Sequence, residues 1–528
     1  MDDPAVRAGG PPAVGAEDAA ADVRTVAKGG GVQILGQIAT EILAFVFIAA
    51  ATHILSKPAY GLFRKAYQLL TVFGQVGLLG LNYSTMRFIA KARALGDAGG
   101  VRGAVRVGVM GTGAASLVVF ALLFLGAPPI AEFFAGAEGD RQGLESLLRI
   151  GAAFVPLFAL MQTLRYGTQA YKNMLPSVIV GNIVQPMARI VLGIAALVAG
   201  LQVAGLMWTT VISVAIGTAL GFWYLRRVMT AEERAARPAH RIRSMLGFAL
   251  PQAGSSILGF QALGLGIIVL GLYQSDAAVA VFGVALSLQR PGSIFLSGIV
   301  NIWAPMVTDL HARDEIARLD RLYKTVNRWT STFSFPVYTA LIAFPAFFVD
   351  LLTPAYGEAA VVTAVLAAGN LFYTGTGPAG YVISMTGRPW LNLINSAFAV
   401  GAYVGLGVLI VPTHGALGMA FVDAVVTAAI NLARVVEAKL LVGVQPFGRS
   451  FLKPVGASCV MGAVLLSWRL LPEGFLVQLS GLLVAGLAYL GVLVALGVDE
   501  EERQVWRLIR SRLLRGRYRR ARDASGAS

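Results

Sequence analysis

The sequence contains a long series of apolar segments, separated by short polar or charged stretches. A helix of about 20 or more apolar residues spans the hydrocarbon core of a bilayer, so this pattern predicts an all-α, polytopic membrane protein. The composition agrees with this prediction. Only 13% of the 528 residues are charged and 56% are hydrophobic, whereas soluble proteins carry roughly 25% charged residues.

We expect about fourteen spanning segments of this length. In chain order they are residues 29–55, 60–82, 104–125, 147–171, 176–199, 203–224, 245–273, 277–307, 329–352, 360–385, 391–411, 416–438, 455–470 and 475–496. Residues 1–28 lack the apolar core of a signal peptide and are typical of a disordered cytoplasmic tail.

The distribution of Lys and Arg predicts the topology. They gather in the loops that follow even-numbered segments, such as residues 87–102, 226–243 and 313–324, whereas loops after odd-numbered segments are nearly uncharged or acidic, with Lys57 and Arg141 as exceptions. Cytoplasmic loops carry the excess of cations, so both termini are expected in the cytoplasm of a protein of the cytoplasmic membrane. The net charge of +15 therefore reflects topology, and no nucleic-acid partner is expected. The longest outer loop, residues 126–146, is too short for a folded domain.

Two similar stretches indicate an internal repeat. Residues 59–63 (Ala-Tyr-Gly-Leu-Phe) and residues 281–285 (Val-Phe-Gly-Val-Ala) each lie near the start of a segment that ends in a basic loop. A shift of six helices preserves orientation, so we expect two parallel six-helix lobes, with substrate bound between them. The lobes are residues 29–226 and 245–441, joined by a basic cytoplasmic linker at 227–244.

The remaining C-terminal residues form two further regions. Residues 442–498 contain the last two spanning helices, and 499–528 form a basic cytoplasmic tail. Within this tail, apolar residues at helical spacing in 500–522 favour an amphipathic helix on anionic membrane lipids. A solvated stretch that anchors the topology is the alternative.

The sequence offers no pattern for catalysis or metal binding. Its single cysteine, Cys459, excludes an internal disulfide, and the four histidines (His53, His240, His311 and His414) lack ligand spacing. Paired carboxylates in an outer loop, a nucleophile motif and a phosphate-binding loop are also missing. We therefore expect no enzyme, no cofactor and no metal site.

Charged residues inside the apolar segments are the candidate functional residues, because such charges are costly in a bilayer and often mark a site. They are Arg64, Lys65, Arg165, Arg189 and Arg290 as candidate substrate-binding cations, and Glu41 and Asp423 as candidate coupling residues. The excess of cations favours a phosphate-bearing substrate, since Arg offers a bidentate fork to phosphate oxygens. Each cation has an alternative role in which it extends to the membrane interface or pairs with a nearby acid. The two acids either titrate or neutralise an arginine.

Several motifs resemble those of polysaccharide-export flippases, the oligosaccharidyl-lipid branch of the multidrug/oligosaccharidyl-lipid/polysaccharide exporter superfamily. They are residues 53–63, 248–251 (Phe-Ala-Leu-Pro), 304–305 (Ala-Pro), 377–380 (Gly-Pro-Ala-Gly), 385–387 (Met-Thr-Gly) and 415–420. The resemblance implies two six-helix lobes in a V around a central cavity, with two extra C-terminal helices. It also implies translocation of polyprenyl-diphosphate-linked sugars by alternating access. Relatives often carry an Asp in the seventh helix, where residues 264–266 of this chain are uncharged.

We therefore expect a monomeric flippase for lipid-linked oligosaccharide used in cell-surface polysaccharide synthesis, with H⁺ or Na⁺ coupling as an open question. A cation-coupled multidrug or small-molecule antiporter of the same fold is the alternative, although it would favour more acids within the membrane. A membrane polymerase or glycosyltransferase would need a long outer loop with Arg or acidic residues, which this sequence lacks.

Overall fold

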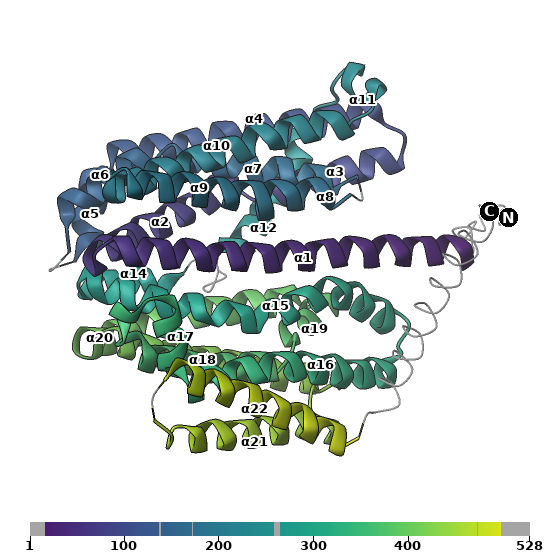
Figure 1. Ribbon diagram of the computed structural model, residues 1–528. Helices are drawn as coiled ribbons and strands as arrows, with labels where there is room; N and C mark the ends of the chain where they lie inside the picture. Colours follow the sequence, from purple (N-terminus) through teal and green to yellow (C-terminus); the bar gives the residue numbers. More distant parts are fainter. Residues whose placement is uncertain (1–15, 137–138, 172, 258–263, 473, 498–528) are drawn as a thin grey trace, which may run out of the picture.

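The computed structural model describes residues 16–136, 139–171, 173–257, 264–472 and 474–497 (Figure 1). Helices account for nearly all of these residues, which confirms the expected all-α membrane fold. Within the described residues, eight helices are long and apolar enough to cross a membrane, or up to eleven if each bent pair counts as one span. The expected number of fourteen stays a prediction. Both the expected basic tail and residues 1–15 lie outside the described residues.

The N-terminal lobe is the upper layer in Figure 1. Its helices are α2 (Lys57–Leu78), α3 (Leu81–Ala94), α4 (Ala98–Leu125), α5 (Ala127–Ala135), α6 (Arg141–Gly151), α7 (Phe154–Gln169), α8 (Leu175–Val178), the π-helix η1 (Ile179–Val184), α9 (Gln185–Val198) and α10 (Gln202–Val228). The short helix α11 (Ala231–Ala235) lies at one end of this lobe, and α5 and α6 lie at the other. We call these two ends of the molecule the α11 end and the α5 end.

The C-terminal lobe forms the lower layer. It contains α14 (Leu265–Tyr273), α15 (Asp276–Ala312), α16 (Ile316–Ala343), α17 (Pro345–Leu352), the 3₁₀ turn η2 (Pro354–Tyr356), α18 (Ala359–Gly375), α19 (Ala379–Met385) and α20 (Pro389–Val442). After the turn η3 (Arg449–Phe451), the last helices α21 (Leu452–Trp468) and α22 (Phe475–Ala495) pair along the outside of α16. Tyr489 attaches this pair by donating to the carbonyl of Thr332 at 2.8 Å.

Helix α1 (Ala16–Ile54) connects the lobes by packing against both, whereas α12 (Ile242–Ile257) packs on the N-terminal lobe. The long helix α1 runs between the lobes and packs against α9 and η1 on one side and α15 on the other (Figure 1). It begins at Ala16, before the start at residue 29 that hydropathy predicts. Helix α12 belongs by sequence to the expected second lobe but packs on α3, where Ser84 Oγ donates to the carbonyl of Met245 at 2.9 Å.

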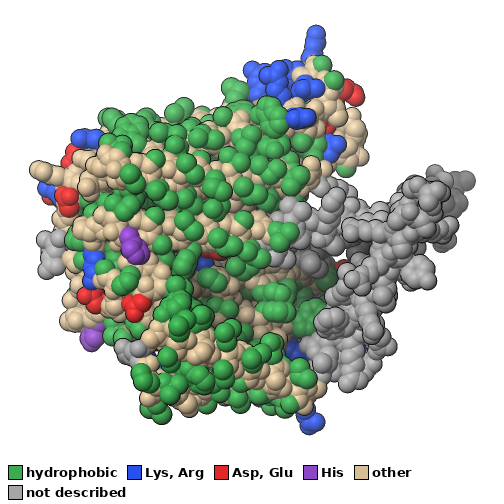
Figure 2. Space-filling model, viewed as in Figure 1, with side chains coloured by type: hydrophobic (Ala, Val, Ile, Leu, Met, Phe, Trp, Pro, Cys, Tyr) green, Lys and Arg blue, Asp and Glu red, His purple; other side chains and the backbone are tan. Residues whose placement is uncertain are grey.

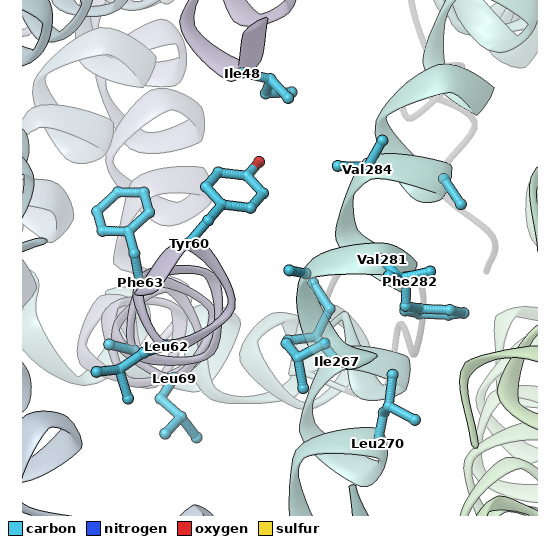
Figure 3. Close-up of a cluster of buried hydrophobic side chains, with 14 of the residues drawn as sticks. Ile48, Tyr60, Leu62, Phe63, Leu69, Ile267, Leu270, Val281, Phe282 and Val284 are labelled. Carbon is cyan, nitrogen blue, oxygen red and sulfur yellow. The ribbon is translucent and has the colours of Figure 1, made fainter. Parts of the chain in front are cut away.

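A continuous apolar core joins the lobes at their contact. Residues of α1, α2, α14 and α15 belong to this core, and Figure 3 shows Ile48, Tyr60 and Val284 directed toward the space between their helices. The face shown in Figure 2 is also largely hydrophobic, with most charged side chains toward the two ends and a hollow between the lobes. An apolar band between charged ends is typical of a protein that spans a bilayer.

Two expected loops are helical in the structure. Leu79 (φ 45°) and Gly80 (φ 70°) interrupt the helical backbone for only two residues between α2 and α3. Arg87, Lys91 and Arg93 therefore lie on a helix, where a basic loop is expected. In the expected outer loop, residues 127–135 similarly form α5 and residues 141–146 form the start of α6, where Leu144, Leu147 and Leu148 give α6 a buried apolar face.

The expected eleventh and twelfth segments together form α20, which folds back at Gly415 (φ 54°). Side chains on its two arms pair in antiparallel order. Asn395 donates to Glu437 at 2.7 Å, and Tyr403 donates to Asp423 at 2.9 Å. The chain reversal at a glycine agrees with the expected break between residues 411 and 416, since an L-residue with a side chain rarely adopts this backbone.

Candidate binding site between the two lobes

The lobes meet most closely at the α5 end, where α2 packs against α15. A Cβ added at Gly61 would lie 1.6 Å from the carbonyl oxygen of Asp276, so only glycine allows this approach. Lys65 Nζ lies 2.6 Å from Asp276 Oδ1, and both side chains are almost fully buried. The backbone N–H of Asp140 donates to the other carboxylate oxygen at 3.1 Å. The charge of Lys65, an expected binding cation, is therefore neutralised within this contact.

The preceding residue on α2 has a different environment. Arg64 lies against α15, and a Cβ added at Gly283 would be 2.9 Å from its Nε. This Nε is buried without a hydrogen-bond partner. No carboxylate among the described residues forms an ion pair with Arg64. Two other cations, Arg189 and Arg290, lie within electrostatic range.

Arg189 of α9 faces the same region from the N-terminal lobe. Its NH1 donates to the hydroxyl of Tyr67 at 3.1 Å, and its guanidinium lies over the rings of Phe47 (4.9 Å) and Tyr67 (5.5 Å). The Nε atom is buried without a partner, and no described carboxylate forms an ion pair with this arginine either. Aromatic rings reduce the cost of burying a cation but leave most of its N–H donors free.

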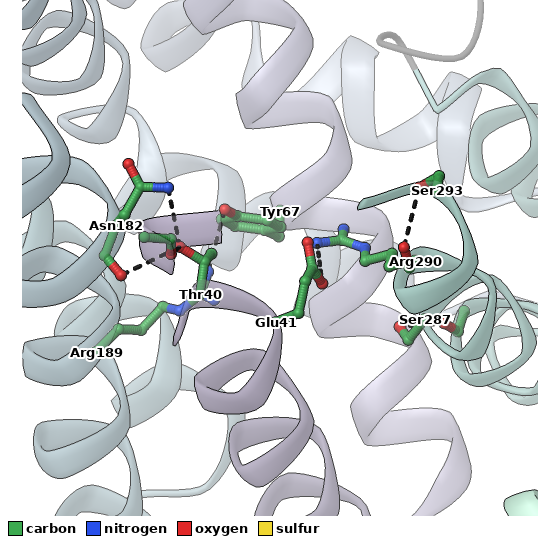
Figure 4. A network of polar contacts seen from close by, with 10 residues as sticks. Thr40, Glu41, Tyr67, Asn182, Arg189, Ser287, Arg290 and Ser293 are labelled. Carbon is green, nitrogen blue, oxygen red and sulfur yellow. Dashed lines mark hydrogen bonds and ion pairs between the residues drawn. The ribbon is translucent and has the colours of Figure 1, made fainter. Parts of the chain in front are cut away.

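Arg290 of α15 enters the region from the C-terminal lobe (Figure 4). Its NH1 lies 3.8 Å from Oε2 of Glu41 on α1, and its side chain is 52% exposed, compared with 13% for Glu41. This long, half-solvated contact leaves the guanidinium accessible to another anion. Thus α1, α2, α9 and α15 bring three arginines and one glutamate together between the lobes. We call Arg64, Arg189 and Arg290 the arginine cluster.

Two other candidates are held by different partners. Arg165 of α7 lies within the N-terminal lobe and donates to the carbonyl of Ser177, to Gln162 and to Asn182, at 3.1, 2.8 and 3.2 Å. Most of its donors are therefore used by α7, α8 and η1. Asp423 accepts from Tyr403 within the α20 hairpin, beside α14, and has no ion-pair partner among the described residues.

Several uncharged residues around the arginine cluster could not be recognised as candidates from the sequence. Tyr67 and Phe47 enclose Arg189, and Asn182 and Thr40 hydrogen-bond each other between η1 and α1 at 3.0 Å (Figure 4). Tyr67 lies three positions after Arg64, and residues at that spacing share a helix face. That spacing is the one sequence signal that would have pointed to Tyr67.

A family model described as "Polysaccharide biosynthesis protein" matches residues 26–311, more than half of the chain. The chain belongs to this family. The matched residues include the whole arginine cluster and Glu41, whereas Asp423 lies beyond them. No curated protein matches the sequence.

Solved structures with a similar fold are flippases and transporters. A lipid II flippase MurJ in an inward closed conformation is 13% identical, covers 87% of this chain and 96% of its own, and gives a TM-score of 0.67. An inward-facing multidrug resistance MATE transporter of the MOP superfamily is 15% identical, with 78% and 98% coverage and a TM-score of 0.63. An outward-facing transporter of the same description gives a TM-score of 0.52 at 17% identity, with 79% and 95% coverage. The chain is thus a multi-pass membrane protein with the fold of these transporters.

Proposed function

We propose that this protein is a flippase that moves a polyprenyl-diphosphate-linked oligosaccharide from the inner to the outer leaflet of the cytoplasmic membrane, for cell-surface polysaccharide synthesis. The arginine cluster is the observation that carries this proposal. Arg64 and Arg189 each keep a buried Nε without a hydrogen-bond partner, and neither forms an ion pair with a carboxylate of the described residues. Cations held in this way within a membrane are costly, and their persistence points to a ligand of opposite charge. A diphosphate offers several oxygens to the forked donors of arginine.

The chemistry of the substrate explains why a protein is needed. Each sugar hydroxyl stranded in hydrocarbon costs several kcal/mol, so spontaneous flipping of an oligosaccharide is negligible. The lipid II flippase named among the similar structures provides a precedent for this fold. Outward movement of each negative charge gains about 2.3 kcal/mol per 100 mV of inside-negative potential.

The placement of the contacts supports alternating access as the proposed mechanism. By the distribution of Lys and Arg, the α11 end faces the cytoplasm and the α5 end faces outward. The contact of Lys65 with Asp276 then closes the outer end beyond the arginine cluster. Substrate would enter from the cytoplasmic side, and release to the outside would require α2 and α15 to separate at Gly61.

Glu41 and Asp423 are the proposed coupling residues. A diphosphate bound by Arg290 would compete with the 3.8 Å contact to Glu41, so protonation of Glu41 would favour substrate binding. Asp423, held by one tyrosine hydroxyl, would supply a second titratable group or a ligand for Na⁺. Through either group, an ion gradient could drive the return of the empty protein to the conformation that accepts the next substrate.

A cation-coupled antiporter is the second candidate, because the MATE transporters share the fold and Asp423 has no basic partner within the part of the chain that the structure describes. Three arginines at the lobe contact disfavour it, since they would repel a cationic substrate. We therefore rank it second.

Translocation in proteoliposomes tests the proposal. A fluorescent polyprenyl-diphosphate oligosaccharide is reconstituted with wild-type protein, Arg290→Ala or the control Arg313→Ala. The fraction of the lipid in the outer leaflet is measured as the fluorescence that an external quencher removes. Arg313 is a matched control because its side chain is 63% exposed and pairs with Asp309 at the end of α15. We expect flipping by the wild type and the control and its loss in Arg290→Ala. Flipping that survives Arg290→Ala would remove the arginine cluster from the mechanism, and absence of flipping together with efflux of an organic cation would establish the antiporter.

A further inference from the structure

A second group of polar and aromatic side chains surrounds the break between α18 and α19. The two helices bend by 41° there, and Gly377 has a φ of 63°. Broken helices at membrane depth occur where protein encloses them or where they line an aqueous cavity. Asn392 of α20 covers part of this backbone, since its Nδ2 donates to the carbonyl of Gly380 and to Oγ of Ser384.

Arg434, on the second arm of α20, also lies against Gly380, with its Cδ 3.6 Å from an added Cβ. Its Nε is buried without a hydrogen-bond partner, as is Oδ1 of Asn392. Glu437 lies within electrostatic range of Arg434, but its carboxylate accepts from Asn395 instead of forming an ion pair with this arginine. An unused planar donor and an unused planar acceptor therefore flank the same helix break. Leaving both unsatisfied costs free energy that a polar ligand would recover.

Aromatic side chains complete this region. Tyr381 of α19 is 42% exposed and lies within electrostatic range of both Arg434 and Tyr83 of α3. Tyr83 belongs to the N-terminal lobe and packs edge-on against Tyr166, with ring centroids 4.9 Å apart. Tyr381 and Tyr83 thus bring an aromatic ring from each lobe into electrostatic range of each other.

Two tyrosines of the C-terminal lobe lie near this region and near Arg290. Tyr338 of α16 donates to the carbonyl of Gln289, the residue before Arg290, at 3.3 Å. Tyr338 is also in electrostatic range of Tyr373, which is in turn in range of Arg434.

We propose that Tyr381, Asn392 and Arg434, with Tyr83 opposite, bind the sugar part of the lipid-linked substrate; this inference rests on the proposed function. We call these four residues the glycan platform. A pyranose ring has an apolar C–H face that stacks on an aromatic ring, and a rim of hydroxyls that match planar donors and acceptors. Arg434 adds affinity for a sugar that carries a carboxylate or phosphate. The arginine cluster would hold the diphosphate while the platform recognises the glycan.

Variants of the glycan platform and of the arginine cluster should have different effects on the affinity for two lipids. Affinities of purified full-length protein are measured for polyprenyl diphosphate and for polyprenyl diphosphate that carries an N-acetylhexosamine disaccharide. We expect the disaccharide to strengthen binding by the wild type about tenfold, as one or two net hydrogen bonds and a stacked ring would provide. Tyr381→Ala and Arg434→Gln should remove most of this gain and leave binding of the bare lipid unchanged. Arg290→Gln should weaken binding of both lipids.

Control variants distinguish recognition from folding. Phe398→Ala removes an aromatic ring of α20 that is 74% exposed and should leave both affinities unchanged. Tyr381→Phe keeps the ring and should retain most of the gain. A disaccharide that adds nothing to wild-type affinity, or a Tyr381→Ala variant that weakens both lipids equally, would overturn the glycan platform while the diphosphate site stands. Failure of the wild type to bind either lipid would instead overturn the proposed function.

Discussion

The contact between α2 and α15 contains two regions of opposite character. At the α5 end, Lys65 is buried against Asp276 at 2.6 Å, and glycine brings the backbones together. One residue away in sequence, Arg64 is half-buried beside Gly283, its Nε is buried without a hydrogen-bond partner, and two further cations lie within electrostatic range. The first region satisfies its charges internally, so it holds the lobes together. The second leaves its charges unsatisfied, so it is suited to bind an anion.

Under the proposed function, this difference distinguishes charges that hold the lobes together from charges that bind substrate, which charge type alone does not. Lys65 and Arg165 are both cations within apolar segments, and the structure gives each of them several partners. Arg64, Arg189 and Arg290 together have one hydrogen-bonding tyrosine and one long contact to a carboxylate. Substitutions in the two regions should therefore change stability in opposite directions.

The largest change in stability is expected at the α5 end, where Lys65 contacts Asp276. Asp276→Ala leaves Lys65 buried without a counter-ion, and loss of one partner of a buried pair costs about 3–5 kcal/mol. We expect a large decrease in the thermal unfolding temperature of the purified protein in detergent. The double variant Lys65→Met/Asp276→Leu should restore most of that stability, since apolar residues replace a buried pair well. An unfolding temperature that Asp276→Ala leaves unchanged would show that the pair contributes nothing to closure.

A smaller effect of opposite sign is expected at the neighbouring residue. Arg64→Met removes an unsatisfied buried donor, which costs about 1–3 kcal/mol, and keeps an apolar side chain of similar length beside Gly283. The unfolding temperature should rise, while affinity for polyprenyl diphosphate falls at least several-fold. Lys65→Met alone is the matched comparison and should be destabilising. A fall in stability for Arg64→Met would contradict the contrast between the two regions.

The smallest effect is expected at Glu41. Its contact with the half-exposed Arg290 is long, and exposed ion pairs contribute only about 0–1 kcal/mol, so Glu41→Gln should barely change stability. Removing the competing carboxylate should raise affinity for polyprenyl diphosphate a few-fold and make that affinity less dependent on pH. Binding measured across the weakly acidic to neutral pH range checks both expectations. A decrease in affinity would show that Glu41 contacts the substrate directly.

Much of the fold was predictable because lipid imposes strict rules on a chain. Apolar length predicts helices, and the break between residues 411 and 416 is confirmed as the reversal at Gly415. The helical nature of residues 83–94 was missed, because cations suggest a loop while the helix needs only satisfied backbone hydrogen bonds. The packing of α12 on the N-terminal lobe was also missed, since hydropathy contains no information about which neighbour a span contacts.

The sequence by itself determined that the chain is a polytopic helical protein of the membrane, and it limited the candidate residues to a few intramembrane charges. Only the tertiary structure decided which of these charges are paired. Arg64 and Lys65 are adjacent and alike in charge, yet successive side chains on an α-helix point about 100° apart. Lys65 therefore meets Asp276, while Arg64 lies against Gly283, within electrostatic range of two other arginines. Partners from α9 and α15 are distant in sequence, so packing alone brings them together.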